Sequence, residues 1–171
     1  MMYGTLVTAA AYHAAVGNPI WIDAQYSDDQ RTAAMVRARR VMDGRYGLVF
    51  TGAKALLDQP CAWPRVGAYD VCAQQEIPSD VTPSGILEAS YEIALIELQR
   101  PNSLSPTINI GRLTKSESVD GAASRSFFSP EELAAFGNNP LQNMRPTLMV
   151  VEDLLSCFIS VNGRRWAATV V

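Results

Sequence analysis

The sequence predicts a mainly α protein: a small helical bundle of about four to five helices with long ordered loops, a β-ribbon and an extended C-terminal arm. Apolar residues recur at helical spacing in separate segments, and capping residues and prolines stand at the ends of those segments. The 171 residues suffice for one domain with a buried core. We expect a helical core with a long Trp-Pro-Arg loop at 1–106, an extended ribbon or loop at 107–128, C-terminal helices at 129–159 and a tail at 160–171.

Two helices are expected near the N-terminus. The first covers residues 8–16, with Thr8 as its N-cap and the sequence GNP at 17–19 as its end. Trp21 follows, and we expect it to pack on the core. The second helix begins after Ser27, because Ser27 and Gln30 have the spacing of a capping box, and it continues to about residue 47.

Residues 47–81 lack the periodicity of a helix or a strand and contain the sequence QPCAWPRVGAYD at 59–70. Irregular loops longer than about 12–15 residues are uncommon in compact domains and are usually functional. One interpretation is structural: Trp63 pins the loop, Pro64 fixes its backbone and Arg65 reaches a carboxylate. The other is that Trp63, Pro64, Arg65 and Tyr69 contact a partner protein, with a platform for stacked bases as a third alternative.

The second half of the chain contains the best candidate for the central helix, followed by a segment in which serine, threonine and glycine replace helix-forming residues. A helix is expected at 84–99, with Thr82 as its cap, Pro83 in its first turn and Pro101 after its end. Residues 107–128 are predicted to form a ribbon that turns at Asp120-Gly121. Short helices follow at 129–137 and within 146–159, and residues 160–171 form either a hairpin at their Asn-Gly pair or an extended arm.

Composition excludes several classes of protein. The net charge is −3, which gives no general attraction to nucleic acid. Cys61, Cys72 and Cys157 occur singly, with no C-x-x-C pair, and the chain has one histidine, so the tightly spaced ligands of a structural zinc site are missing. The odd count fits a reducing cytosol better than a disulfide framework. No apolar run approaches the ~20 residues of a membrane span, so we expect a soluble protein without a membrane partner.

No catalytic motif is present. The chain has no nucleophile elbow, P-loop or dinucleotide-binding glycine pattern, and His13 is expected to be structural or on the surface. We therefore predict no catalytic, cofactor-binding or metal-binding residues and no cofactor, and we expect a protein that is not an enzyme.

Two basic segments stand out. In VRARR at 36–40, Arg37 and Arg40 share a helix face while Arg39 points elsewhere, so the patch is divided. Near the C-terminus Arg164, Arg165 and Trp166 could stack on a base or anchor in a partner's pocket.

Four sequences, taken in order, resemble one family. They are YGTLVTAAAYHAAVGN followed by Trp21, AAMVRARRVMDGRYG, AWPRVGAYD, and IPSDVTPSGILEASYEIAL. Over about residues 3–106 they resemble a tailed-bacteriophage family often labelled DnaT-like single-stranded-DNA-binding proteins, and VVEDLLSCFI resembles the Asp-Leu-Leu helix of that family. The family is similar to head-tail connector adaptors, mainly α-helical proteins that form a twelve-fold ring beneath the portal.

The resemblance implies a structural virion protein at the head-tail junction, made in the host cytoplasm. Its implied partners are other copies of the chain in a dodecamer, the portal protein and the neck or tail completion protein. Genomic DNA would pass through the channel without sequence-specific binding. Trp63, Pro64, Arg65, Tyr69, Arg164, Arg165 and Trp166 are the expected contact residues. The alternative function is a single-stranded-DNA-binding replication accessory protein that uses the arginines of the second helix.

Overall fold

The structure is a computed structural model that describes residues 1–105, 114–120, 122–127, 129 and 146–160. The chain forms two compact units: one joins Met1–Ser103 with Leu148–Val171, and the other is Leu104–Thr147. The helices of the first unit are α1 (Leu6–Ala15), α2 (Asp28–Tyr46), α3 (Ser84–Gln99) and α6 (Met149–Leu155), with short 3-10 turns at η1 (Pro19–Ile22) and η3 (Ser156–Phe158). The mainly α fold is therefore confirmed. Over the described residues, no helix is long and apolar enough to cross a membrane.

The N-terminal helices begin where side chains satisfy the free N–H groups of the first turn. In α2 the Ser27 hydroxyl accepts from the Gln30 N–H while the Gln30 side chain accepts from the Ser27 N–H, as predicted. The prediction that Thr8 caps the first helix is wrong. Thr5 is the cap, and Thr5 and Thr8 bond each other's backbone N–H groups, so α1 begins at Leu6.

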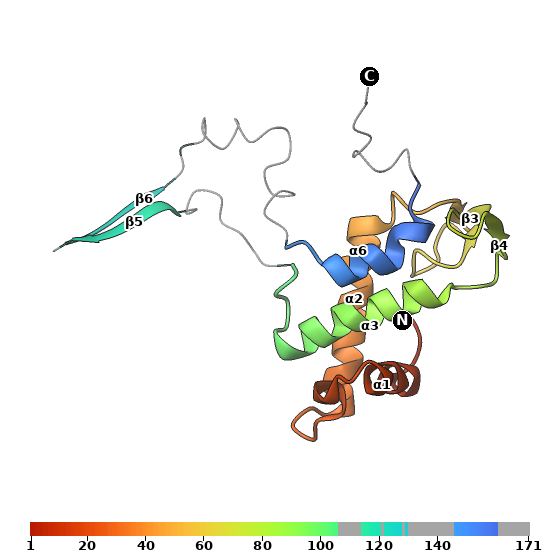
Figure 1. Cartoon of the computed structure of the whole chain (residues 1–171), viewed down its shortest axis with the longest axis horizontal. Coiled ribbons are helices and arrows are strands. Elements are labelled where there is room, and N and C mark those ends of the chain that lie inside the picture. Colours follow the sequence, from red (N-terminus) through yellow and green to blue (C-terminus); the bar gives the residue numbers. More distant parts are fainter. Residues whose placement is uncertain (106–113, 121, 128, 130–145, 161–171) are drawn as a thin grey trace. The chain divides into compact units, whose positions relative to one another are not determined.

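Helix α3 is the central element of the first unit. In Figure 1 it lies between α6 and α1 and crosses α2. It begins after Pro83, which makes no side-chain cap bond, so the expected cap at Thr82 is wrong. The Pro83 backbone oxygen accepts the N–H groups of Ile86 (3.1 Å) and Leu87 (3.3 Å), so the helix begins there without a capping side chain.

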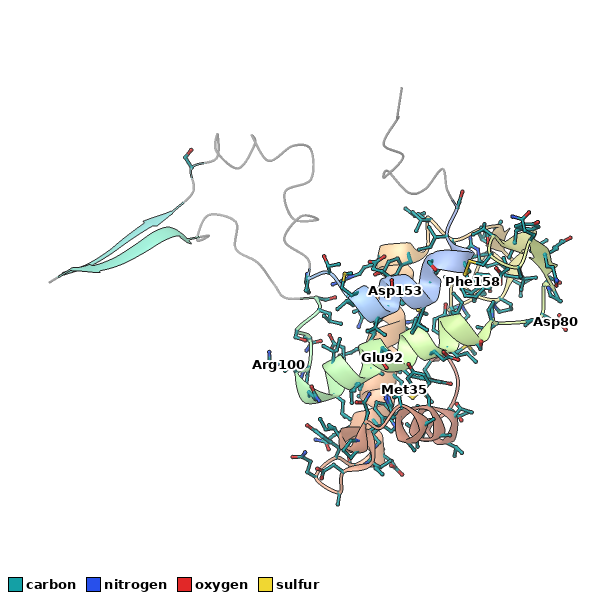
Figure 2. All side chains as sticks on the ribbon, in the orientation of Figure 1. Met35, Asp80, Glu92, Arg100, Asp153 and Phe158 are labelled. Carbon is teal, nitrogen blue, oxygen red and sulfur yellow. A yellow bond between two sulfur atoms is a disulfide. The ribbon has the colours of Figure 1, made fainter. Side chains whose placement is uncertain are left out.

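The helices approach one another closely because small residues lie at their contacts. The face of α2 in the core carries Ala34 and Ala38 beside Met35, and all three are buried. Gly85 of α3 faces η3, where a Cβ would lie 2.7 Å from the Phe158 ring. Figure 2 shows Met35 and Phe158 among the packed helices and Arg100 on the outside. Trp21 is fully buried, as expected.

Residues 47–81 contain four short strands, so the prediction of an irregular loop is wrong in this respect. β1 (Ala53–Lys54) pairs with β2 (Arg65–Val66), and β3 (Ala68–Asp70) pairs with β4 (Gln75–Ile77), both antiparallel. Two or three residues are too short to show the alternation that identifies a strand in a sequence. The backbone of Gly52 has φ +68 and lies against the 66–68 segment, where a Cβ would be 2.5 Å from the Val66 oxygen.

The second unit contains a ribbon of β5 (Thr114–Asp120) and β6 (Ala122–Phe127). The strands are antiparallel, and Asp120 pairs with Ala122 across the turn. The two strands thus lie within the predicted ribbon segment, and the chain reverses between Asp120 and Ala122. The helix expected at 129–137, apart from residue 129, and the tail from 161 onward lie outside the described residues.

Candidate functional site

Arg65 organises the Trp-Pro-Arg loop from inside. Its guanidinium donates to the backbone oxygens of Thr51 (2.7 Å), Gly52 (2.7 Å) and Ala62 (3.2 Å), and the side chain is buried. The guanidinium also lies 6.0 Å from the centre of the Phe50 ring. Burial lowers the pKa of Arg65 from its ordinary value. The expected carboxylate partner is therefore wrong: main-chain carbonyls accept all three bonds, and one cation joins β2 to the segment before β1.

Trp63, two residues before Arg65, is buried in the core. It is 2 % exposed and makes edge-on contacts with Phe50 and Phe158, at ring-centre distances of 5.7 and 6.2 Å. The peptide between Trp63 and Pro64 is cis. Trp63 therefore pins the loop to the core, as the structural interpretation predicts. Because its ring is buried, it offers no face on which a base could stack.

A short chain of hydrogen bonds ties this segment to α2. The Trp63 N–H donates to the Tyr3 hydroxyl (3.1 Å), which donates to the Asp43 carboxylate (2.7 Å). Burial, more than any other cause, raises the pKa of both Tyr3 and Asp43. The N-terminus, α2 and the loop are thus joined by one polar path through partly buried groups.

Several large apolar side chains of the same region are exposed. Leu48 and Leu57 are fully exposed, Leu56 and Val66 are more than half exposed, and Tyr69 is 39 % exposed. The Tyr69 backbone is braced on both sides by Thr51, whose hydroxyl accepts the Tyr69 N–H and donates to the Tyr69 oxygen, each at 3.0 Å. Of the residues predicted as contacts, Tyr69 is therefore available at the surface. Trp63 and Arg65 support the surface from within.

Of the five arginines of α2, Arg31, Arg37 and Arg39 make hydrogen bonds and ion pairs inside the unit. Arg31 donates to the backbone oxygens of Trp21 and Asp23 and pairs with Asp28. Arg39 donates to the Pro60 oxygen and pairs with Asp43. Arg37 is described below, and Arg40 is exposed. The basic run read from the sequence therefore does not form one free patch.

The Arg37–Glu97 pair is the main polar contact between α2 and α3. Arg37 Nε lies 3.0 Å from Glu97 Oε2, and Arg37 Nη2 donates to the Glu97 backbone oxygen at 2.9 Å. The same carboxylate accepts the Asn102 N–H at 2.7 Å, which holds the turn after α3. Glu97 is fully buried, so its charge depends on these partners. The sequence analysis missed this pair, although a glutamate on the apolar face of a helix was a signal for it.

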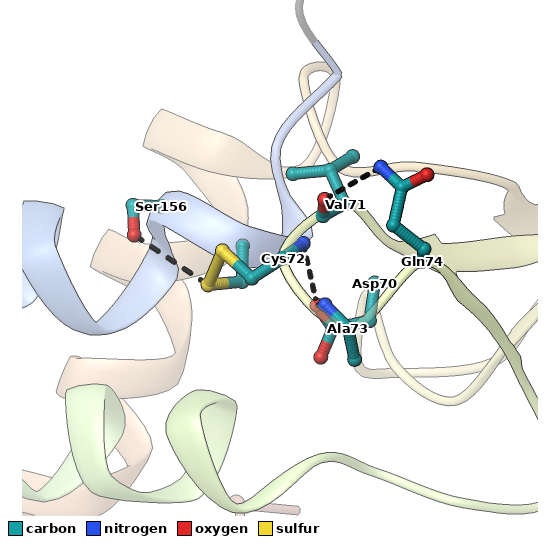
Figure 3. Close-up of a disulfide and its surroundings, with 7 residues drawn as sticks. Asp70, Val71, Cys72, Ala73, Gln74 and Ser156 are labelled. Atoms are coloured by element: carbon teal, nitrogen blue, oxygen red, sulfur yellow. Dashed lines mark hydrogen bonds between the residues drawn. A yellow bond between two sulfur atoms is a disulfide. The ribbon is translucent and has the colours of Figure 1, made fainter.

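Cys72 and Cys157 form a disulfide across 85 residues of sequence. Figure 3 shows the bond at the turn between β3 and β4, where the Asp70 carboxylate accepts the N–H groups of Cys72 (2.9 Å) and Ala73 (2.8 Å). Cys61 is free and buried. The expectation that the cysteines remain single is wrong for two of them. No local pattern could have paired them, because pairing at this separation depends on the tertiary fold.

His13 is buried, in agreement with the structural alternative. Its ring lies 4.9 Å from that of Trp21 and 5.2 Å from that of Tyr12, between ring centres. Burial lowers the pKa of His13, and the nearby Glu92 acts in the opposite direction. The other predicted contact residues, Arg164, Arg165 and Trp166, lie outside the described residues.

The fold and surface define a small, mainly α protein with an internally braced loop that exposes several apolar side chains. A family model described as "Putative DnaT-like ssDNA binding protein" matches residues 2–171. The match covers nearly the whole chain, and the protein belongs to this family. No curated protein and no solved structure matches the chain. The family resemblance seen in the first 106 residues is thus confirmed, while its connection to head-tail connectors stays a prediction.

Proposed function

We propose that this protein is a structural subunit of a head-tail connector, without catalytic activity, that assembles with copies of itself into a ring between the portal and the neck or tail completion proteins. The observation that carries the proposal is the set of exposed apolar side chains in the 47–81 region, with Leu48 and Leu57 fully exposed. Exposed leucines of this kind favour contact with another protein, whereas a nucleic-acid surface needs cations.

The brace beneath that surface suits a binding role. Arg65 and Trp63 fix the loop from within, so little conformational entropy remains to be lost when a partner binds. A ring also requires two different surfaces on each subunit, since head-to-tail contacts whose rotation closes generate rings. The exposed end of α1, with Val7, and the exposed face of α6, with Met149 and Val150, are further apolar surfaces of the first unit.

Charge supports passage of DNA without retention. The net charge is −3, and Arg31, Arg37, Arg39 and Arg65 are bonded within the described part of the chain. Each phosphate contact that a protein makes adds salt-dependent affinity, which would slow DNA moving through a channel. We propose a dodecamer as the ring, the portal and the neck or tail completion protein as neighbours, and the virion head-tail junction as its location.

Replacing exposed leucines tests the proposal. Leu48→Ser with Leu57→Ser should leave monomer stability within about 0.5 kcal/mol, because both side chains are fully exposed. Each leucine buried in an interface contributes roughly 1.5–3 kcal/mol, so the double variant should weaken self-association at least tenfold per contact. Mass photometry over a concentration series measures this. Asp58→Ser, an exposed polar neighbour, is the control. Equal association of the leucine variant and the wild type would contradict the proposal.

The C-terminal residues Arg164, Arg165 and Trp166 are proposed as an arm onto a neighbouring ring. A chain ended after Ile159 should keep its helix content by circular dichroism, because Val151, Leu155 and Phe158, which hold α6 and η3, are all retained. It should lose attachment in the virion. Particles of normal yield carrying the shortened chain would remove the arm from the proposal.

Single-stranded-DNA binding is the second candidate, and the family match supports it more directly than it supports the connector. Of the α2 arginines, the exposed Arg40 is the residue we propose for phosphate contact. Fluorescence anisotropy with a labelled oligonucleotide should then show affinity that falls steeply with salt, and Arg40→Ala should reduce the logarithmic slope by about 0.7. If the protein does not bind the oligonucleotide at low salt, single-stranded-DNA binding is rejected and the connector proposal remains.

A further inference from the structure

Three potential metal ligands lie together at the surface of the first unit. The side chains of Asp70, Cys72 and Cys157 place one oxygen and two sulfur atoms within 4.8 Å of one another. Cys72 is exposed, and Asp70 and Cys157 are partly exposed, so reductants and ions can reach the cluster. The chain of Figure 3 has the two sulfurs joined as a disulfide. Opening that bond would convert them into two free thiols beside a carboxylate.

The backbone holds these three residues in place independently of the disulfide. The Val71 N–H donates to the Cys157 oxygen at 2.9 Å, which ties the β3–β4 turn directly to η3. The Thr51 N–H donates to the Phe158 oxygen at 2.9 Å, and the buried Phe158 and Leu155 side chains anchor the same segment. Reduction of the disulfide therefore leaves the two cysteines near each other, because the backbone hydrogen bonds of Val71 and Phe158 do not depend on the S–S bond.

The position of the Asp70 carboxylate is fixed in the same way. Its Oδ1 accepts the N–H groups of Cys72 and Ala73, which fixes the carboxylate at the turn, where one of its oxygens lies within 4.8 Å of both sulfurs. Hydrogen bonds of this kind to a ligating carboxylate orient it and strengthen metal binding. Two thiolates, one carboxylate and a water complete the tetrahedral coordination that Zn²⁺ prefers. The sequence analysis excluded a four-ligand zinc site, and this site needs only three protein ligands.

We infer that Cys72, Cys157 and Asp70 form a redox-controlled site for Zn²⁺ or a similar thiophilic divalent cation, which binds the reduced chain and is released when the disulfide forms. Binding to the dithiol releases the two thiol protons. For release, a low-molecular-weight disulfide such as oxidised glutathione is the oxidant. The two protein thiolates give up two electrons as their S–S bond forms, the S–S bond of the oxidant breaks into two thiolates, and the metal ion leaves.

Cobalt titration of the full chain tests the inference. After reduction with a phosphine and removal of the reductant under anaerobic conditions, Co²⁺ should give sulfur-to-metal charge-transfer absorption at one ion per chain, and Zn²⁺ should displace it. Addition of oxidised glutathione should abolish the signal. Cys72→Ser and Cys157→Ser should each remove the charge-transfer band, and Asp70→Asn should weaken binding by about tenfold or more.

The buried free thiol supplies the matched control. Cys61→Ser should bind Co²⁺ as the wild type does, since Cys61 is buried and belongs to no cluster of three such ligands among the described residues. Circular dichroism of each reduced variant checks that the helices remain. A reduced wild-type chain that binds no more Co²⁺ than the Cys72 variant, or a signal that disappears with Cys61→Ser, overturns the inference.

Discussion

The α2–α3 pair and the 47–81 loop belong to the same unit but are stabilised differently. Helix α2 has a local cap, and the two helices bury small apolar residues along their length and share the Arg37–Glu97 ion pair. The loop depends on single side chains that reach distant segments, chiefly Arg65 to the 51–52 carbonyls and Trp63 to Phe158. Substitution of one residue in the helix contact should therefore remove a small part of the packing between α2 and α3. Substitution of Arg65 or Trp63 should remove most of the contacts that hold the loop.

Trp63→Ala gives the largest expected effect and tests this difference directly. Loss of a buried tryptophan costs about 3–5 kcal/mol, and urea denaturation should show it. Trp21→Ala, at an equally buried position beside α1, is the matched variant. Hydrogen exchange should show residues 50–70 losing protection in the Trp63 variant while α2 and α3 keep theirs. Loss of protection spread evenly over both regions would break the comparison.

Glu97→Leu should cause the next largest loss of stability. It leaves the Arg37 guanidinium without its carboxylate, and we expect a loss of roughly 2–3 kcal/mol, reduced from the fully buried case because Arg37 is 23 % exposed. The double variant Arg37→Met with Glu97→Leu should recover to within about 1 kcal/mol of the wild type, since no unpaired charge remains. A double variant less stable than both single variants would show that the pair itself holds the two helices.

His13→Phe should produce the smallest effect, visible as a change with pH. The folded-state pKa of His13 lies below its ordinary 6.5 because of burial, so the unfolded chain binds the proton more readily. The stability that neutral His13 contributes is present above pH 6.5 and is lost as the pH falls below it through the folded-state pKa. The wild type should lose at most about 1.4 kcal/mol per pH unit relative to the variant.

Unfolding free energies at pH 7, 6 and 5 measure this difference. Asp43, whose pKa is raised by burial, acts with the opposite sign toward acid pH and is common to both proteins, so the subtraction removes it. Parallel stability curves for the two proteins would contradict the prediction.

The helices could be predicted because their signals are local. The capping box at Ser27 and Gln30, the prolines at 83 and 101, and the apolar spacing of Val151 and Leu155 each act within one or two turns. The signal for the chain reversal between Asp120 and Ala122 is equally local. The error at the start of α1 was one choice between two threonines three residues apart, either of which could have capped a helix.

The loop could not be predicted because its partners are distant in sequence. Nothing near Arg65 indicates that backbone oxygens at 51, 52 and 62 will accept its protons, and a carboxylate was the expected partner because paired charges are the usual solution for buried arginine. The Cys72–Cys157 bond is similar, since it spans 85 residues. The exposed leucines Leu48, Leu56 and Leu57 lie in turns and bends outside the strands, and their exposure depends on how those turns fold against the rest of the unit.

The bridge between Phe50 and Ile159 and the packing of α6 on α3 mean that the first unit is completed by both ends of the chain, with residues 104–147 inserted between them. During synthesis the core of the first unit can therefore be completed only after α6 has left the ribosome. Until then the nascent chain exposes the surface of α3 that α6 covers in the folded protein. The inserted segment, by contrast, is free to differ in length among family members, because extending a loop costs only about 0.6 kcal/mol for each doubling of its length.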